Sequence, residues 1–282
     1  MSRRGGAADV DIGGWLARAR SAGVDRLDAQ LLLARHLGRP RAWLLAHDDE
    51  AIAPALLARL EADLARRADG VPLAYLVGER EFCGLVLQVG ADVLVPRPET
   101  EGLVEWALEL APQAPLRRLI DLGTGSGAVA LAFRHRAHAD FEVHASDRSE
   151  AALAVARANG ARLGLPVTWH AGDWWEPLSG QMFGIAVSNP PYVKAGDPHL
   201  GALRHEPTAA LVAGEDGLQA LRAIVGGAPA RLPPGGWLLL EHGHDQSEAV
   251  AALLAGSGFA AIQTRNDLAG LARLTGGRRP LA

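Results

Sequence analysis

The tetrapeptide Asn189-Pro190-Pro191-Tyr192 contains residue types that could hold a planar amino group. The asparagine side chain offers a carbonyl oxygen as an acceptor, and Pro190 adds a backbone carbonyl. Together these two oxygens could accept both hydrogens of an –NH2 group, while the ring of Tyr192 covers its face. A turn that merely ends a strand would also explain the two prolines, so the rest of the sequence must decide.

The residues before the tetrapeptide indicate why it would be rigid. The apolar run 185–188 is typical of a buried strand, and proline cannot continue the hydrogen bonding of a sheet. A residue that precedes proline is also held in an extended conformation. We therefore expect Asn189 to lie at the carboxyl end of a strand.

A glycine-rich stretch forms a second candidate site: Asp121-Leu122-Gly123-Thr124-Gly125-Ser126-Gly127. It follows a predicted strand and begins a predicted helix. Glycine allows a tight turn and a close approach of the backbone to a ligand. The spacing G-x-G-x-G differs from the G-x-G-x-x-G of dinucleotide sites, and the Gly-Lys-Ser/Thr of a P-loop does not follow.

Acidic residues end the next two predicted strands. Asp147 lies 20 residues after Gly127 (147 − 127), where a carboxylate can hydrogen-bond the hydroxyls of a ribose. Asp173 and Trp174 follow the third strand, where a carboxylate and an indole could bind an adenine ring. Because the carboxyl ends of parallel strands share one sheet edge, these residues predict a nucleoside site. The alternatives are a helix cap for Asp147 and a core position for Trp174.

The C-terminal part of the chain alternates between strand and helix patterns, which predicts an α/β domain with a mostly parallel sheet. The seven predicted strands cover residues 118–121, 142–146, 167–170, 185–188, 237–241, 259–264 and 271–275. The last connection, residues 265–270, is too short for a parallel crossover. One strand should therefore run antiparallel to its neighbours.

The N-terminal part predicts helices without a cluster of catalytic residue types. Apolar residues recur at helical spacing after residue 11, Asp25 can cap a second helix that ends near Gly38, and Pro54 can begin a longer one. We expect residues 1–78 to form a helical domain that recognises the substrate. Alternation over residues 81–95 predicts a β-hairpin, which places a linker at residues 79–98 and the second domain at residues 99–282.

Composition limits the class of protein. A length of 282 residues with 49% hydrophobic residues favours two folded domains. The net charge of −4 argues against a main task of coating nucleic acid. A single cysteine, Cys83, excludes an internal disulfide, and Met1 to Ala8 lack the apolar core of a signal peptide. We expect a cytoplasmic protein that does not enter membranes.

Two histidine pairs could suggest a metal site, His135 with His138 and His242 with His244. No further ligand types converge on either pair in the sequence. We therefore expect no bound metal.

The glycine-rich loop, the acidic strand ends and the Asn189 tetrapeptide together resemble a class-I S-adenosylmethionine-dependent methyltransferase. The segment Val95-Pro96-Arg97-Pro98-Glu99-Thr100-Glu101 narrows the resemblance to the HemK/PrmC family of protein-(glutamine-N5) methyltransferases, which modify peptide-chain release factors. Further matches are Gly78-Glu79-Arg80-Glu81-Phe82, Glu206-Pro207 and Leu240-Glu241-His242-Gly243. The resemblance covers nearly the whole chain.

This resemblance implies a Rossmann-like methyltransferase domain after a helical bundle and a β-hairpin, with S-adenosyl-L-methionine as the cofactor and S-adenosyl-L-homocysteine as the product. The cofactor-binding residues would be Gly123, Thr124, Gly125, Ser126, Gly127, Asp147, Asp173, Trp174 and Asn189. The substrate glutamine amide would be held by Asn189, Pro190, Pro191 and Tyr192, with Arg97 and Glu99 beside them. Asn189, Pro190 and Tyr192 would be the catalytic residues.

The long polar segment 194–217 predicts part of a substrate channel, with His205, Glu206 and Pro207 near its entrance. The alternative is a flexible surface excursion.

Three other functions remain open at this stage. An adenine amino group presents the same planar –NH2, but a nucleic-acid substrate would favour a basic groove. Glutamine methylation of a large-subunit ribosomal protein would use the same tetrapeptide. A non-catalytic nucleoside-binding module would not need Asn189. With class-I release factors as the protein partner, we expect a monomer without direct nucleic-acid binding.

Overall fold

The computed structural model of the chain describes residues 10–281. The stretch Met1 to Ala8, in which we expected no signal peptide, lies outside these residues. The chain divides after Gly78 into two compact units. No helix of the described part combines the length and the apolar character that crossing a membrane requires.

The N-terminal unit is a helical bundle, as predicted. Its helices are α1 (Ile12–Ser21), α2 (Arg26–Leu37), α3 (Arg41–Leu44), α4 (Pro54–Ala68) and α5 (Leu73–Val77). The Asp25 carboxylate caps α2 by accepting a hydrogen bond from the Leu27 amide at 2.7 Å. Gly38 ends α2 in the left-handed conformation, with φ of 63°. The buried side chains Trp15, Leu32 and Leu60 pack together in its core.

A short β-hairpin begins the second unit, with β1 (Glu79–Phe82) paired to β2 (Leu85–Gln88). The predicted hairpin extended to Val95, but the strand pairing ends at Gln88. Val93 and Val95 are buried without belonging to a strand, because the chain turns at residues 90–93. Phe82 and Leu87 pack into the core of the second unit, so the hairpin is part of that unit.

The second unit contains the predicted seven-stranded sheet. Its strands are β3 (Arg118–Leu122), β4 (Glu142–Asp147), β5 (Thr168–Ala171), β6 (Ile185–Ser188), β7 (Trp237–Glu241), β8 (Ala260–Asn266) and β9 (Ala272–Arg278). Their order is β5-β4-β3-β6-β7-β9-β8, and β9 runs antiparallel to both neighbours. The predicted Rossmann-like class-I methyltransferase fold with one antiparallel strand is confirmed.

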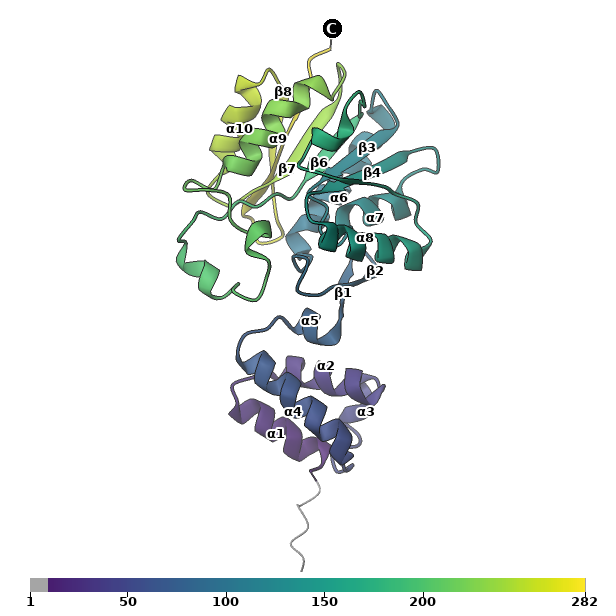
Figure 1. Cartoon of the computed structure of the whole chain (residues 1–282), viewed down its shortest axis with the longest axis vertical. Helices are drawn as coiled ribbons and strands as arrows, with labels where there is room; N and C mark the ends of the chain where they lie inside the picture. The colour runs from purple at the N-terminus through teal and green to yellow at the C-terminus, as the bar shows by residue number, and fades with distance from the viewer. Residues whose placement is uncertain (1–9, 282) are drawn as a thin grey trace, which may run out of the picture. The chain divides into compact units, whose positions relative to one another are not determined.

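Helices cover both faces of this sheet (Figure 1). One face packs against α6 (Glu101–Leu110), α7 (Ala128–Arg136) and α8 (Glu150–Leu163), and the other against α9 (Gln219–Gly227) and α10 (Ser247–Gly256). Short 3-10 turns lie at Pro98–Thr100, Ala111–Gln113, Glu176–Leu178, Pro198–Gly201, Thr208–Ala210 and Ala228–Ala230. Because the strand order reverses between β3 and β6, a crevice is expected beside the carboxyl ends of these strands.

Candidate active site

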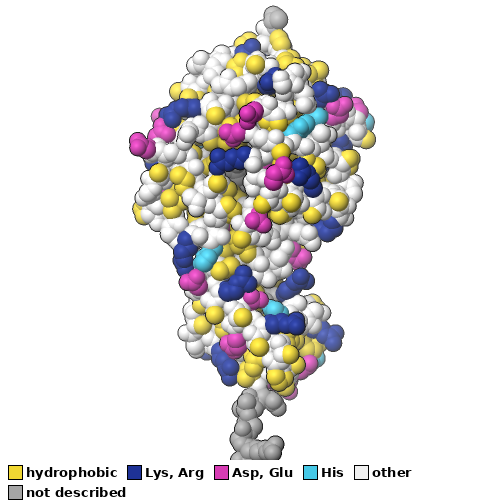
Figure 2. Space-filling view, in the orientation of Figure 1, with side chains coloured by type: hydrophobic (Ala, Val, Ile, Leu, Met, Phe, Trp, Pro, Cys, Tyr) yellow, Lys and Arg dark blue, Asp and Glu magenta, His cyan; other side chains and the backbone are white. Residues whose placement is uncertain are grey.

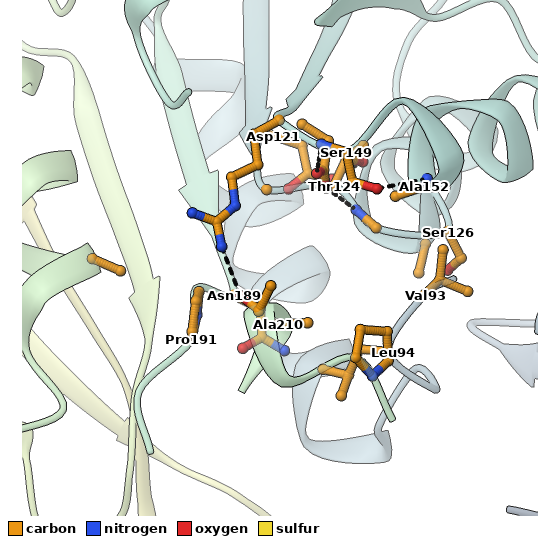
Figure 3. A pocket seen from close by; sticks show the side chains of 18 of the residues that line it. Val93, Leu94, Asp121, Thr124, Ser126, Ser149, Ala152, Asn189, Pro191 and Ala210 are labelled. Carbon is orange, nitrogen blue, oxygen red and sulfur yellow. Dashed lines mark hydrogen bonds between the residues drawn. The ribbon is translucent and has the colours of Figure 1, made fainter. Parts of the chain in front are cut away.

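A cavity of about 330 Å³ lies at this crevice, and every residue that lines it belongs to the second unit. Its volume falls within the range of roughly 300–1,000 Å³ that is typical of small-molecule sites. Figure 3 shows Asp121, Thr124 and Ser149 on one side of the cavity and Asn189, Pro191 and Ala210 on another. The strand ends therefore bring the two candidate sites of the sequence to one place.

The glycine-rich loop is tied to the neighbouring strand β4. The amides of Gly123 and Thr124 donate to the same carbonyl oxygen, that of Ser146, at 2.8 and 3.0 Å. Gly123 has φ of 73°, and a Cβ atom there would lie 3.0 Å from Cζ3 of Trp174. Glycine is therefore required both by the turn and by the indole packed against it.

Asp147 lines the cavity and is held by backbone amides. Its Oδ2 accepts from the Gly125 amide and its Oδ1 from the Ser149 amide, each at 2.9 Å. Each carboxylate oxygen keeps a second lone pair for a ligand. The side chain is thus fixed in position and can still accept hydrogen bonds.

Asp121 lies near the end of β3 and supports the glycine-rich loop through hydrogen bonds. Burial raises the pKa of this carboxyl to about 7, and the nearby Asp147 charge adds to the rise. Hydrogen bonds from the Thr124 hydroxyl and the Ala130 amide act in the opposite direction and lower the pKa. The Thr124 bond measures 2.6 Å and the Ala130 bond 3.2 Å. Asp121 therefore joins the glycine-rich loop to the start of α7.

Asp173 and Trp174 line the cavity beyond the end of β5. Trp174 has φ of 44°, a left-handed conformation that residues other than glycine rarely adopt. The Ser146 hydroxyl holds this conformation by donating to the Trp174 carbonyl oxygen at 3.2 Å. Such backbone strain persists where surrounding contacts enforce it, often at ligand sites.

Asn189 reaches the cavity directly after β6. Its Nδ2 donates to the Thr100 hydroxyl oxygen at 3.0 Å, and Thr100 is buried at the end of the 3-10 turn Pro98–Thr100. The Ser188 hydroxyl bonds the Leu122 carbonyl oxygen at 2.6 Å, which locks the ends of β6 and β3 together. The amide oxygen of Asn189 is thus left for a ligand.

Some predicted site residues do not line the cavity. Pro190 is buried, Glu99 is exposed, and Gly127 packs so closely that a Cβ atom there would lie 3.1 Å from Trp169. The pKa of Tyr192 rises to about 12 because the ring is buried and the Glu241 charge is near. The predicted residues that do line it are Gly123, Thr124, Gly125, Ser126, Asp147, Asp173, Trp174, Asn189, Pro191 and Arg97.

The segment 194–217 covers part of the cavity, with Pro207 and Ala210 among the lining residues. Arg97 and Glu206 form an ion pair that anchors it, and the Glu206 side chain is only 3% exposed. Oε2 of Glu206 also accepts from the Val95 amide at 3.1 Å. The segment is therefore attached to the Val95–Glu101 stretch.

Three polar residues at or near the cavity were missing from the sequence-based site. Thr100 stood in a recognised motif, but nothing in the sequence paired it with Asn189. Arg148 lines the cavity and donates to the Ala209 carbonyl oxygen at 3.4 Å. Glu241 lies buried behind Tyr192. A polar residue at the end of a predicted strand was the available signal for Arg148 and Glu241.

Residues 10–281 contain no group of three or more His, Cys, Asp or Glu side chains placed to hold an ion.

Comparisons with known proteins address the identity of this site. Residues 15–78 match the PrmC N-terminal domain, and residues 105–206 match the methyltransferase small domain. A release factor glutamine methyltransferase of Xylella fastidiosa is 48% identical over 94% of this chain and 97% of its own length. The chain belongs to the release factor glutamine methyltransferase family. The family resemblance predicted from the motifs is confirmed.

Other members of the release factor glutamine methyltransferase family support this placement. The Bordetella pertussis enzyme is 50% identical over 90% of this chain and 95% of its own length. The Salmonella typhimurium enzyme is 43% identical over 95% and 99% of the two chains. Such coverage includes both units.

Solved structures of more distant methyltransferases share the fold of this family member. The hMettl16 catalytic domain has a TM-score of 0.56 at 15% identity and covers 81% of this chain and 82% of its own. The Thermus thermophilus 16S rRNA N2 G1207 methyltransferase has a TM-score of 0.53 at 22% identity, over 71% of this chain and 49% of its own. At these identities the likeness concerns the fold alone.

Proposed function

We propose that this protein transfers a methyl group from S-adenosylmethionine to the side-chain amide nitrogen of the glutamine in the Gly-Gly-Gln motif of class-I release factors. The observation that carries the proposal is the Asn189 amide, held by Thr100 at a cavity that also contains the glycine-rich loop. Membership of a family of glutamine methyltransferases supports glutamine as the methyl acceptor. The cavity has room for S-adenosylmethionine as the methyl donor.

The residues of the cavity fit this cofactor. Gly123 allows the Trp174 indole to pack against the glycine-rich loop, Asp147 can accept from ribose hydroxyls, and Trp174 offers an aromatic surface for the adenine. When bound, the cofactor supplies an electrophilic methyl group on a sulfonium sulfur. Asp173 and Ser126 would complete the contacts around it.

The acceptor side must activate a poor nucleophile, because the lone pair of an amide nitrogen is delocalised into its carbonyl. Asn189 Oδ1 and the Pro190 carbonyl would accept the two amide hydrogens and orient the nitrogen toward the methyl group. The same dipoles would stabilise the positive charge that develops on the nitrogen as its bond to the methyl group forms and S-adenosylhomocysteine leaves. Loss of one amide proton to solvent would then give the neutral N-methyl amide. Positioning and preorganised dipoles each contribute several kcal/mol in enzymes, so a strong base is not required.

Tyr192 would help to shape the amide site from outside the cavity lining, and the exposed Glu99 would contact the substrate. Arg97 would reach the substrate backbone from the cavity rim. The segment 194–217 would form one wall of the substrate channel. The N-terminal unit would recognise the release factor, because it carries no cluster of catalytic residue types.

A nucleic-acid acceptor has less support. Figure 2 shows Lys and Arg side chains interspersed with Asp and Glu on the face in view, and the net charge is −4. Phosphate contacts would favour a continuous basic surface. We infer a monomer that acts on a protein in the cytoplasm, where release factors function.

A labelled-methyl assay tests the proposal. The protein is incubated with S-adenosylmethionine labelled in its methyl group and separately with a class-I release factor, a large-subunit ribosomal protein and an adenine-containing nucleic acid. Label should appear on the release factor and be lost when its Gly-Gly-Gln glutamine is changed to alanine. Label on either other acceptor, with none on the release factor, would overturn the proposed substrate.

A further inference from the structure

Gln246 is a buried glutamine that the chemistry described above does not use. It lies directly before α10 with 5% of its surface exposed. Its Oε1 accepts from the Gly243 amide at 2.9 Å, and its Nε2 donates to the carbonyl oxygens of Tyr192 at 3.1 Å and Gly217 at 3.4 Å. One side chain therefore joins the last residue of the tetrapeptide to the end of the segment 194–217.

The surroundings of Gln246 determine the orientation of its amide. A primary amide has one acceptor oxygen and two N–H hydrogens, and here it faces one backbone N–H group and two carbonyl oxygens. All three contacts pair a donor with an acceptor in one orientation only. A carboxylate of the same size would place an oxygen against both carbonyl oxygens, and an apolar side chain would remove the donor that they share. These contacts therefore favour glutamine over both.

Gly217 lies close to the same carbonyl group. Its φ is 74°, and a Cβ atom there would lie 2.5 Å from the Tyr192 carbonyl oxygen and 2.8 Å from Gln246 Nε2. Both distances are shorter than a relaxed contact allows, so the close approach requires glycine. Tyr192, Gly217 and Gln246 thus form one tightly packed cluster, which we call the Gln246 junction.

The Gln246 junction closes the base of the segment 194–217. Just inside it, Val193 donates from its amide to the Leu211 carbonyl oxygen at 2.8 Å and accepts from the Ala213 amide at 2.9 Å. The chain leaves the tetrapeptide, forms one wall of the cavity and returns to the point at which it left. The same contacts therefore set the position of the tetrapeptide and that of the wall.

We propose that Gln246 is a positioning residue for the substrate amide, because it holds the tetrapeptide and the channel wall together at the Tyr192 carbonyl. The inference rests on the proposed function, in which the tetrapeptide binds the substrate glutamine. Tyr192 follows Pro190 by two residues, so a shift of its backbone displaces the carbonyl and the ring that would contact the substrate amide. A displacement of about 1 Å can lower a rate by roughly 100-fold.

Two variants break the junction from its two partners. Gln246→Met removes the donor and keeps a side chain of similar length, and Gly217→Ala places a methyl group against the Tyr192 carbonyl oxygen. We expect kcat/KM for the release factor to fall roughly 10- to 100-fold in both. The dissociation constant for S-adenosylmethionine, measured by titration calorimetry, should change less than about threefold, because none of the three Gln246 bonds involves the glycine-rich loop. A role in folding alone would not separate these two quantities.

Two matched variants control for stability and for backbone strain. Leu254→Ala truncates a fully buried side chain about two turns further along α10 and should lower the melting temperature. Gly180→Ala places a Cβ atom on a residue with the same φ of 74°, where nothing lies within 4 Å of it. Both should keep kcat/KM within about threefold of the wild type below their melting transitions.

The outcomes distinguish this inference from the proposed function. A wild-type protein that does not methylate the release factor would overturn the proposed function. An active wild type with normal kcat/KM in either junction variant would overturn the inference alone. Equal losses in the control variants, an equal loss of cofactor affinity or a failure of Gln246→Met to fold would overturn it as well, because Gln246 would then serve stability. If Gly217→Ala does not fold, Gln246→Met alone decides.

Discussion

The two sides of the cavity differ in where the partners of their hydrogen bonds lie along the chain. On the glycine-rich side, the bonds from Thr124 to Asp121 and from Gly125 to Asp147 span 3 and 22 residues. On the other side, the bond from Asn189 to Thr100 spans 89 residues, and Glu206 bonds Val95 across 111. The first side is built by a turn and its contacts with the next strand along the chain, and the second by the packing of more distant segments.

The two sides also differ in how completely their acids are satisfied. Both oxygens of Asp147 accept from backbone amides, whereas one oxygen of Glu241 has no partner among residues 10–281. On the glycine-rich side, backbone amides of the loop and of the residues just after β4 satisfy the acid. On the other side, the buried Glu241 carboxyl keeps this unpartnered oxygen, which lowers stability.

The largest effect is expected at Asn189, on the side built by distant segments. Asn189→Ala should lower kcat/KM for methyl transfer at least about 100-fold, because both the acceptor oxygen and its dipole are lost. Asn266→Ala, a change at an exposed asparagine of β8, is the matched control and should be near wild type. A folded Asn189→Ala protein with near-normal transfer would contradict the assignment of this residue.

The unsatisfied acid on that side predicts a dependence of stability on pH. The folded pKa of Glu241 is about 7 against an ordinary value of 4.5, so the folded state holds this proton more tightly than the unfolded state. The free energy of unfolding should therefore fall as pH rises from about 4.5 to 7, by up to about 3 kcal/mol from this group. Glu99, Arg273 and Tyr192 face the same carboxyl and modify the value.

Denaturant unfolding at pH 5 and pH 8 measures this effect. Glu241→Gln should reduce the loss of stability between the two pH values, while the buried Asp121, whose pKa is also about 7, keeps part of it. An unchanged difference between pH 5 and pH 8 in Glu241→Gln would show that Glu241 titrates normally.

On the locally built side, Asp147→Asn should act on binding more than on catalysis. Asparagine replaces one acceptor oxygen with a donor and disturbs the bonds to Gly125 and Ser149. We expect the dissociation constant for S-adenosylmethionine to rise roughly 10- to 100-fold, and kcat at saturation to fall less. Titration calorimetry with S-adenosylmethionine measures the dissociation constant. An unchanged value would show that Asp147 does not bind the cofactor.

The smallest effect is expected for glycine substitutions, and comparing two of them distinguishes backbone strain from the contact between Gly123 and Trp174. Gly123→Ala and Gly164→Ala both place a Cβ atom on a left-handed residue, with φ of 73° and 65°. Each should cost about 1 kcal/mol of stability. Only the Gly123 substitution meets Trp174, so only this variant should also weaken cofactor binding, by several-fold. Equal cofactor affinities in the two variants would show that the indole contact is unimportant.

Much of the fold was predictable because its signals are local. The strand patterns before Asp121 and Asn189, the cap at Asp25 and the short connection between β8 and β9 depend on neighbouring residues alone. The hairpin was predicted too long because Val93 and Val95 alternate like strand residues, although they are buried by tertiary packing in a turn. Gly127 was predicted to bind the cofactor as part of the glycine-rich loop, but in the structure it packs against Trp169.

By itself, the sequence determined the order of strands and helices, the glycine-rich turn and the proline-stiffened Asn189 tetrapeptide, because sterics and periodicity act between residues close in the chain. Only the tertiary structure decided the pairing of Asn189 with Thr100, the anchoring of Glu206 by Arg97 and the burial of Glu241 behind Tyr192. These contacts arise where strand ends from distant parts of the chain meet at one sheet edge. No local pattern specifies which side chains will face one another there.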